Sequence, residues 1–163
     1  MDLVASLQTA ITVQQSDEAA VSAGLAAGLI LDKVIQGHSI KDALAWALDN
    51  DSPISSSTRD HLRIAMGHSG EPYSVAAKTL GLSCGLPSSL QCSILSAVGA
   101  PSFVEGVRTN IVAGGDNASR NILVGALLAA QYGLEAVPLS WKNKTKLYSA
   151  AESLVDSVIA NRE

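Results

Sequence analysis

Apolar and polar residues follow one another along most of this chain with the spacing of amphipathic helices. The clearest apolar pattern runs from Ala19 to Ile35. Asp17, together with its neighbours Ser16 and Glu18, supplies a capping side chain and early negative charge, and Gly37 provides a stop. These signals predict a long helix between residues 19 and 35.

The same signals predict further helices, with caps at Ser39 and in the Ser55–Ser57 run. No segment shows convincing strand alternation, and no internal repeat is present. We therefore expect an all-α fold, an orthogonal helical bundle built as one domain over residues 1–163. The further helices are expected over residues 40–48, 59–66, 73–80, 88–98, 101–113 and 145–160, with another helix starting at Asp116.

Composition supports a helical core that is large for a short chain. Only 16% of residues are charged, against roughly 25% in typical soluble domains, so most helix faces should be covered. Aromatic residues make up 4%, which leaves Ala, Leu, Val and Ile to fill the core and favours closely spaced helices. Gly24 and Gly28 lie four residues apart on one face, and this spacing predicts a tight crossing with another helix.

Several classes of protein do not fit the sequence. The longest apolar stretches fall far short of the roughly 20 residues that cross a bilayer, so we expect no membrane segment. The N-terminus lacks a signal-peptide pattern, and a cytoplasmic location is the expectation. The eleven basic residues are scattered through a chain of net charge −4, which argues against a nucleic-acid partner. Cys84 and Cys92 are expected to be reduced and buried.

One motif offers chemistry, at the start of the helix expected after residue 115. Asp116 and Ser119 stand three residues apart, on one helical face, directly after Gly114 and Gly115. Two hard oxygens beside backbone N–H groups at a helix start suit Mg²⁺ or a phosphate-bearing ligand. The same residues also form an ordinary helix cap, and the sequence leaves both interpretations open.

A longer pattern surrounds this motif. Gly114-Gly115-Asp116-Asn117-Ala118-Ser119-Arg120 is followed by an apolar helix, by Tyr132-Gly133-Leu134-Glu135-Ala136-Val137-Pro138 and by Trp141. This order resembles the C-terminal half of the ADP-ribosylglycohydrolase family. The earlier segment Ser83-Cys84-Gly85-Leu86-Pro87 is similar to the family branch that contains J-crystallins and selenoprotein J.

The resemblance implies magnesium-dependent hydrolysis of an ADP-ribose linkage, with Asp116 and Ser119 as metal ligands. Family enzymes hold two Mg²⁺ ions between an N-terminal Thr-Asp-Asp cluster and two Asp residues with a Thr or Ser. Nothing in this chain matches the N-terminal cluster, and Ala118 replaces the second Asp. We therefore expect weak or absent Mg²⁺ binding and impaired hydrolysis. The alternative is a non-catalytic, crystallin-like structural or nucleotide-binding protein.

The resemblance also makes Gly114, Gly115, Asn117 and Arg120 candidate contacts for an ADP-ribose-containing ligand. From the residues alone, Arg120 has two interpretations, pairing with a phosphate or a salt bridge to Asp116 or Glu135. No catalytic residue is identified. A missing N-terminal half would leave an apolar surface uncovered, which predicts self-association.

The remaining candidates are expected to be structural. His38, His61 and His68 lack ligand spacing and an adjacent acid, which predicts a surface role. Trp46 and Trp141 could stack on an adenine, but a single Trp on an apolar helix is usually part of the core.

Overall fold

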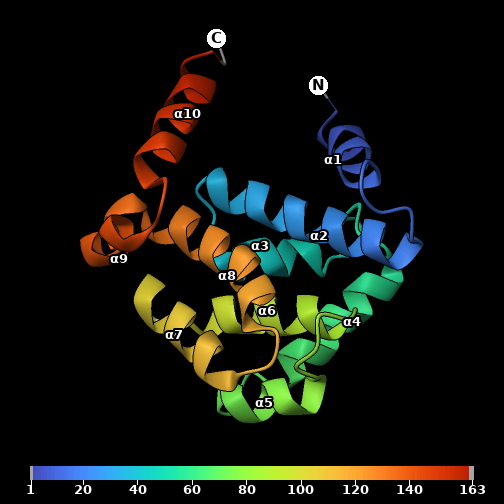
Figure 1. Ribbon diagram of the computed structural model, residues 1–163. Helices are drawn as coiled ribbons and strands as arrows, with labels where there is room; N and C mark the ends of the chain where they lie inside the picture. Colours follow the sequence, from blue (N-terminus) through green and yellow to red (C-terminus); the bar gives the residue numbers. More distant parts are fainter. Residues whose placement is uncertain (1, 162–163) are drawn as a thin grey trace.

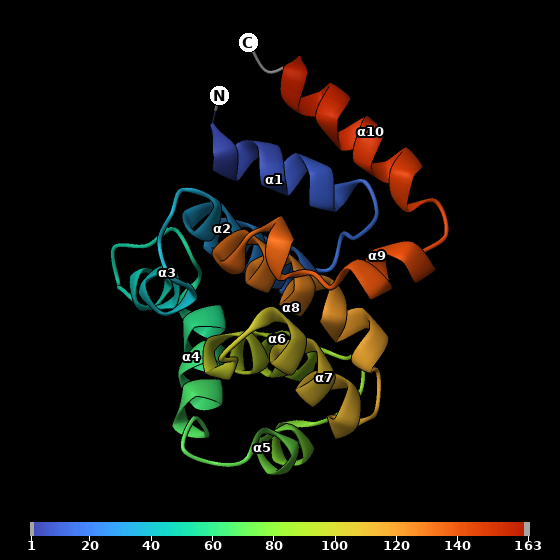
Figure 2. The same cartoon turned by 90° about the vertical axis from the view of Figure 1, so that its left-hand side faces the viewer.

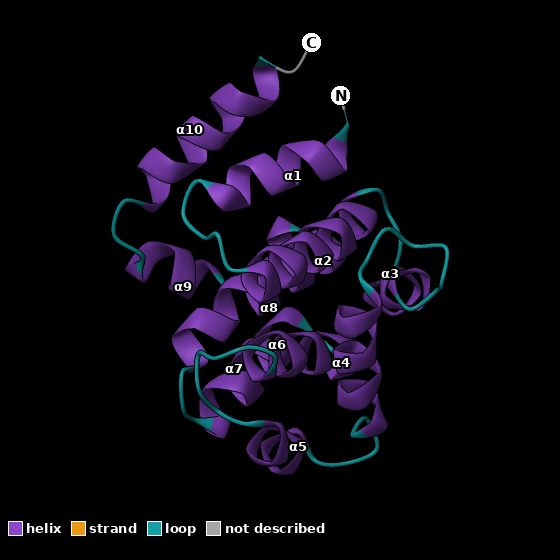
Figure 3. Cartoon of the chain, turned by 90° about the vertical axis from the view of Figure 1, so that its right-hand side faces the viewer, coloured by secondary structure: helices purple, strands orange, loops and turns teal. Residues whose placement is uncertain are grey.

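The computed structural model describes residues 2–161, and every regular element in that range is helical (Figure 1). The all-α prediction is thus confirmed, and Figure 3 shows only helices and loops. The elements are α1 (Leu3–Thr12), α2 (Glu18–Ile35), α3 (Ile40–Ala47), α4 (Ser56–Gly67), α5 (Tyr73–Leu80), α6 (Ser88–Gly99), α7 (Phe103–Ala113), α8 (Asn117–Tyr132), the 3-10 turn η1 (Leu134–Ala136), α9 (Leu139–Lys144) and α10 (Tyr148–Ala160).

Side-chain caps start most of the predicted helices. Each capping oxygen accepts a hydrogen bond from a backbone N–H in the first turn, which satisfies one of the donors that a helix start leaves free. The capping residues are Asp17 for α2, Ser39 for α3, Ser55 for α4 and Ser102 for α7. The capping roles expected at residues 16–18, Ser39 and Ser55–Ser57 are therefore confirmed.

Several elements differ from the prediction: α9 had not been expected, and α4 begins at Ser56, three residues before the predicted start at residue 59. Helix α1 had not been expected, although Val4, Leu7 and Ile11 pack against the core. Helix α10 begins at Tyr148 instead of near Thr145, because Leu147 adopts a left-handed backbone with φ of 64° and interrupts the helical path.

The core lies where α6 meets its neighbours. Helix α6 packs against α4, α5, α7 and α8, while α2 packs against α3 and α8 (Figure 1). The helices cross instead of running parallel: in Figure 3, α4 stands upright while α5 is seen end-on. The largest apolar side chains that are almost completely buried come from five helices: Ile30, Val34, Ile40, Leu62, Ile94, Val124, Leu127 and Leu128.

Gly24 and Gly28 lie where α1 crosses α2. A Cβ atom at Gly24 would lie 2.9 Å from the Ile11 side chain, and one at Gly28 would lie 2.9 Å from the Leu7 side chain. Real side chains do not come this close, so the absence of Cβ atoms sets the distance between the two helices. The predicted tight crossing is confirmed, and α1 is the helix that makes it.

The two ends of the described chain lie on the same side of the bundle, and α1 and α10 project there (Figures 1 and 2). Helix α10 contains no buried residue. Within residues 2–161, no helix combines the length and the apolar character that crossing a membrane requires.

Candidate functional site

The turn between α7 and α8 depends on two glycines. Gly114 and Gly115 have φ values of 79° and 62°, in the left-handed region that other residues rarely adopt. A Cβ atom at Gly115 would also lie 2.3 Å from the backbone oxygen of Leu82. Any other residue at 115 would therefore push the turn away from the segment that precedes α6.

Asp116 is the N-cap of α8, as predicted. Its carboxylate accepts a hydrogen bond from the backbone N–H of Ser119 at 3.4 Å. Its own N–H donates to the Leu82 oxygen at 2.9 Å. The turn thus brings Asp116 and Ser119 together, and the carboxylate performs the ordinary capping function that the sequence had left as one of two interpretations.

A cleft lies between the start of α8 and the first turns of α2, with a volume of about 730 Å³. We call it the α2–α8 cleft. From the motif, Ser119 and Arg120 line it, whereas Asp116 is not among the lining residues. Its full lining is Gln15, Asp17, Ala19, Ala20, Ala23, Gly24, Ala27, Cys84, Leu86, Ser89, Leu90, Ser93, Ser119, Arg120 and Leu123.

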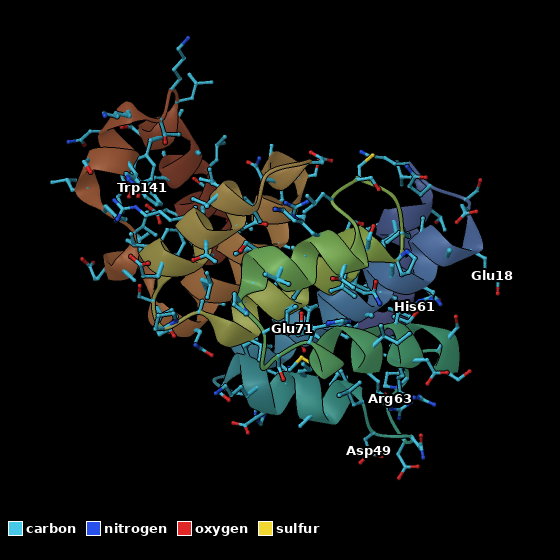
Figure 4. All side chains as sticks on the ribbon, turned by 90° about the horizontal axis from the view of Figure 1, so that it is seen from below. Glu18, Asp49, His61, Arg63, Glu71 and Trp141 are labelled. Carbon is cyan, nitrogen blue, oxygen red and sulfur yellow. The ribbon has the colours of Figure 1, made fainter. Side chains whose placement is uncertain are left out.

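A second cleft of about 600 Å³ adjoins the first and extends toward α4; we call it the α2–α4 cleft. The two share part of one wall, formed by Asp17, Ala19, Ala23, Leu86 and Leu90. The α2–α4 cleft is further lined by Glu18, Ser22, Ser55, Ser56, Ser57, Thr58, His61 and Pro87. Figure 4 shows Glu18 and His61 on the same side of the molecule.

Four helices begin at these adjoining clefts: first-turn residues of α2, α4, α6 and α8 all line them. Each helix start carries a partial positive charge of about half a unit, so four contribute roughly two units. With Arg120 the positive charge is about three units, and it is balanced by the carboxylates of Asp17 and Glu18 in the clefts and of Asp116, which caps α8. Helix α6 also starts without a side-chain cap, which leaves first-turn N–H groups without a side-chain acceptor. The uncapped start of α6 is therefore the part of the clefts that best suits an anion.

Arg120 is buried, with 2% of its surface exposed. Its guanidinium donates to Asn110 Oδ1 at 2.8 Å, to the Leu82 oxygen at 3.2 Å and to the Gly114 oxygen. Neither Asp116 nor Glu135 forms an ion pair with it, so the predicted salt bridge is wrong. Its contact with a phosphate stays a prediction. Three of its five N–H donors already form hydrogen bonds within the protein.

Hydroxyl groups are the side chains at these clefts that sequence reasoning missed. Ser22 lies 2.7 Å from Ser55 and 2.8 Å from Thr58, oxygen to oxygen. Ser22 lies on α2, and its partners, the cap of α4 and a residue in the first turn of α4, lie 33 and 36 positions away in sequence. Single serines on helices carry no signal in the sequence that could have placed them together.

The donor atoms do not fit a Mg²⁺ site. Mg²⁺ requires about six oxygens in nearly octahedral geometry. In the described part of the chain, no three His, Cys, Asp or Glu residues are grouped so that they could hold a metal ion. Asp116 brings one carboxylate, and this group already accepts the Ser119 N–H. We therefore derive no reaction step that passes through a metal.

The other candidates have mixed outcomes. Cys92 is buried as expected, and burial raises the pKa of its thiol, but Cys84 is exposed and lines the α2–α8 cleft. His68 has an acid neighbour after all, because its Nδ1 lies 2.9 Å from Glu71 Oε1. His61 lines a cleft instead of an open surface, while His38 is exposed.

Both tryptophans pack against the core, as expected. Trp141 contacts Phe103 with ring centroids 6.0 Å apart, and Lys33 lies over the Trp46 ring at 4.9 Å. Neither ring lines the clefts described above. Figure 4 shows Trp141 at the opposite end of the molecule from Glu18 and His61.

Two crystallins are similar to part of this chain. Crystallin J1A of Tripedalia cystophora is 39% identical over 70 residues, which cover 43% of this chain and 22% of the crystallin. Crystallin J1B of the same animal is 34% identical over 70 residues, with the same coverage. The matched region is thus under a quarter of each crystallin. No solved structure matches significantly.

The family comparison covers far more of the chain. The family model described as ADP-ribosylglycohydrolase matches residues 2–163, which includes every helix described above and the turn that presents Asp116. On this match, the chain belongs to the ADP-ribosylglycohydrolase family.

Proposed function

We propose that this chain binds an ADP-ribose-containing ligand in its adjoining clefts and that, as this chain, it hydrolyses an ADP-ribosyl linkage slowly or not at all. The observation that carries the binding proposal is that four helices begin at the two adjoining clefts, among them α6, whose start has no side-chain cap. A pyrophosphate brings the negative charge that helix starts favour. Leu86, Pro87 and Leu90 supply an apolar wall for a flat base.

Impaired hydrolysis follows from the donor set. Asp116 is one carboxylate acting as a helix cap, and Ala118 brings no oxygen where the resemblance places the second Asp. Magnesium would orient ribose hydroxyls and activate water if it were bound. The residues of this chain provide too few ligands for that role, so the chain is expected to bind without efficient turnover.

Isothermal titration calorimetry with ADP-ribose tests the binding proposal. We expect saturable binding to the parent chain and weaker binding of adenosine, which lacks the pyrophosphate. Ser119→Glu places a negative charge at the α2–α8 cleft and should weaken ADP-ribose binding by about tenfold. The matched control is Ser153→Glu on α10, which lines neither cleft and should change nothing.

A hydrolysis assay then separates binding from turnover. Release of ADP-ribose from an ADP-ribosylated peptide should stay at the uncatalysed rate with and without added Mg²⁺. Rapid release would show that the chain is an active hydrolase. Absence of ADP-ribose binding in calorimetry would contradict the proposed function.

The similarity to the two crystallins favours a second function, that of a non-catalytic, crystallin-like structural protein. The two functions differ in whether a ligand must bind in the clefts, because a structural protein needs no ligand there. A parent chain that is folded and stable but binds neither ADP-ribose nor adenosine would support the structural function.

A further inference from the structure

Asn110, on α7, connects three parts of the structure that meet beneath the start of α8. Its side chain is completely buried. Its Oδ1 atom accepts hydrogen bonds from Arg120 Nε at 2.8 Å and from the Tyr73 hydroxyl at 3.0 Å. Its Nδ2 atom donates to the backbone oxygen of Asn117 at 3.1 Å. The amide thus faces two donors with its oxygen and one acceptor with its nitrogen.

This arrangement fixes the orientation of the amide. If the amide were reversed, its nitrogen would meet the Arg120 and Tyr73 donors, and its oxygen would meet the Asn117 carbonyl. The contacts with Arg120 and with Asn117 would then each pair like with like inside the protein, where a lost hydrogen bond is costly. Asn110 therefore holds the first residue of α8 in one position relative to α7.

Arg120 completes the connection from the other side. It donates to the oxygens of Leu82 and Gly114, and the Leu82 oxygen in turn accepts the Asp116 N–H at 2.9 Å. Among the described residues Arg120 has no carboxylate partner. An aspartate at 110 would give it one, but only an amide also supplies the donor that reaches Asn117.

We propose that Asn110 is a positioning residue, which acts through Arg120 and Asn117 to hold the first turn of α8 so that Ser119 faces the α2–α8 cleft. Asn110 does not line the cleft itself. Its effect on ligand binding rests on the proposed function of the cleft. Its effect on the start of α8 is independent of that proposed function. The effect on ligand binding and the effect on the helix start can therefore be measured separately.

The test is the variant Asn110→Asp, which keeps the shape of the side chain and an acceptor for Arg120 but removes the donor to Asn117. Hydrogen exchange at the Ser119 and Arg120 amides should become about tenfold faster, the factor expected when one buried hydrogen bond is lost. Affinity for ADP-ribose should fall by a similar factor. The matched control Thr109→Asp adds the same charge at the exposed neighbouring position and should change neither value.

The outcomes separate the two claims. A folded Asn110→Asp chain with parent-like exchange at Ser119 and Arg120 would overturn the positioning role. A parent chain that does not bind ADP-ribose would contradict only the proposed function, because the exchange measurement still decides the role of Asn110. If Asn110→Asp does not fold, Tyr73→Phe removes one donor to Asn110 and should speed the same exchange about threefold. No change in that variant would also overturn the proposal.

Discussion

Tyr73 is a half-buried titratable residue with hydrogen-bond partners on other helices. Its hydroxyl donates toward Asn110 Oδ1 and the Cys92 backbone oxygen, at 3.0 and 3.1 Å. Burial is the main reason that its pKa is raised to about 12, and the nearby Cys92 adds to the rise while Arg120 opposes it. The neutral phenol is thus the form that the fold favours.

This shift predicts a loss of stability at alkaline pH. The unfolded phenol ionises near its ordinary pKa of 10.0 and the folded phenol near about 12, so the unfolded state loses its proton first. The stabilisation that the neutral Tyr73 provides is complete below the pKa of the unfolded state. It is lost as the pH rises to the pKa of the folded state. Because the ring is partly exposed, we expect a loss of about 1–2 kcal/mol.

Urea unfolding of the parent and of Tyr73→Phe measures this contribution. The free energy of unfolding of the parent should fall more steeply than that of the variant between about pH 9 and about pH 11.5. Groups that do not interact with Tyr73 titrate equally in both proteins and cancel in the comparison. Identical pH dependence in the two proteins would show that Tyr73 ionises with an ordinary pKa.

Ala118 is the residue at which the family pattern and this chain differ most in chemistry. Its side chain is exposed in the first turn of α8, so a larger residue fits without repacking. Ala118→Asp would add a second carboxylate near Asp116 and Ser119. Repulsion between the two carboxylates opposes the favourable effect of the helix start, and a bound cation would relieve it.

We therefore predict that Mg²⁺ stabilises Ala118→Asp but not the parent. At a Mg²⁺ concentration tenfold above the dissociation constant, the gain in free energy of unfolding is about 1.4 kcal/mol. Thermal melts with and without Mg²⁺ measure it. Asn117→Asp is the control, because the side chain of residue 117 points about 100° away from that of residue 118 around the helix. Equal melting temperatures for Ala118→Asp in both solutions would mean that position 118 does not face a metal site.

Among the elements, α1 depends most on a neighbour. A helix of ten residues is marginally stable alone, and α1 contains no buried residue, so its packing on α2 supplies most of its stability. Gly28→Leu would place a large side chain where Leu7 now lies. We expect α1 to detach while the rest of the bundle stays folded, at a cost of about 1–3 kcal/mol.

Hydrogen exchange over residues 3–12 would report this detachment. The amides of α1 should lose protection in Gly28→Leu, while those of α6 and α8 keep theirs. Gly125→Leu serves as the control, since open space surrounds a Cβ atom at Gly125. Parent-like protection of α1 in Gly28→Leu would contradict the packing described for this crossing.

Local signals were enough to predict most helices but not their assembly. The starts of α2, α3 and α4 follow from Asp17, Ser39 and Ser55, whose caps act within one turn. Helix α1 was missed because its stability comes from contacts with Gly24 and Gly28, and propensity over ten residues does not reveal them.

Only those parts of the site that are formed by neighbouring residues in the sequence were predictable. The turn at Gly114–Asp116 follows from adjacent residues, and the resemblance placed it in the correct family. The burial of Arg120 was not predictable, since its partners Asn110 and Leu82 lie 10 and 38 residues away. Nor did any pattern indicate that four helix starts would meet at one pair of clefts.

At the scale of the whole molecule, α10 stands out because none of its described residues is buried or packs against the core. Leu154, Val155, Val158 and Ile159 are each more than half exposed on this helix. Contiguous apolar surface of this kind on a soluble protein favours association. We therefore propose that the chain self-associates through α10.

Sedimentation velocity across a range of concentrations tests this association. The parent should sediment faster as its concentration increases, and Leu154→Lys should remain monomeric over the same range. Ser153→Lys adds the same charge to the neighbouring exposed residue and should still associate. A parent chain that is monomeric at every concentration would contradict the proposal.

Binding of ADP-ribose at the clefts can be observed residue by residue in an NMR titration of the labelled chain in the presence of a metal chelator. Binding at the adjoining clefts predicts shifts of the first-turn amides of α2, α4, α6 and α8, including those of Ala20, Ser57, Leu90 and Ser119, while the amides of α10 stay unchanged. Unchanged first-turn amides at a saturating ADP-ribose concentration, or shifts confined to α10, would contradict an ADP-ribose site formed by converging helix starts.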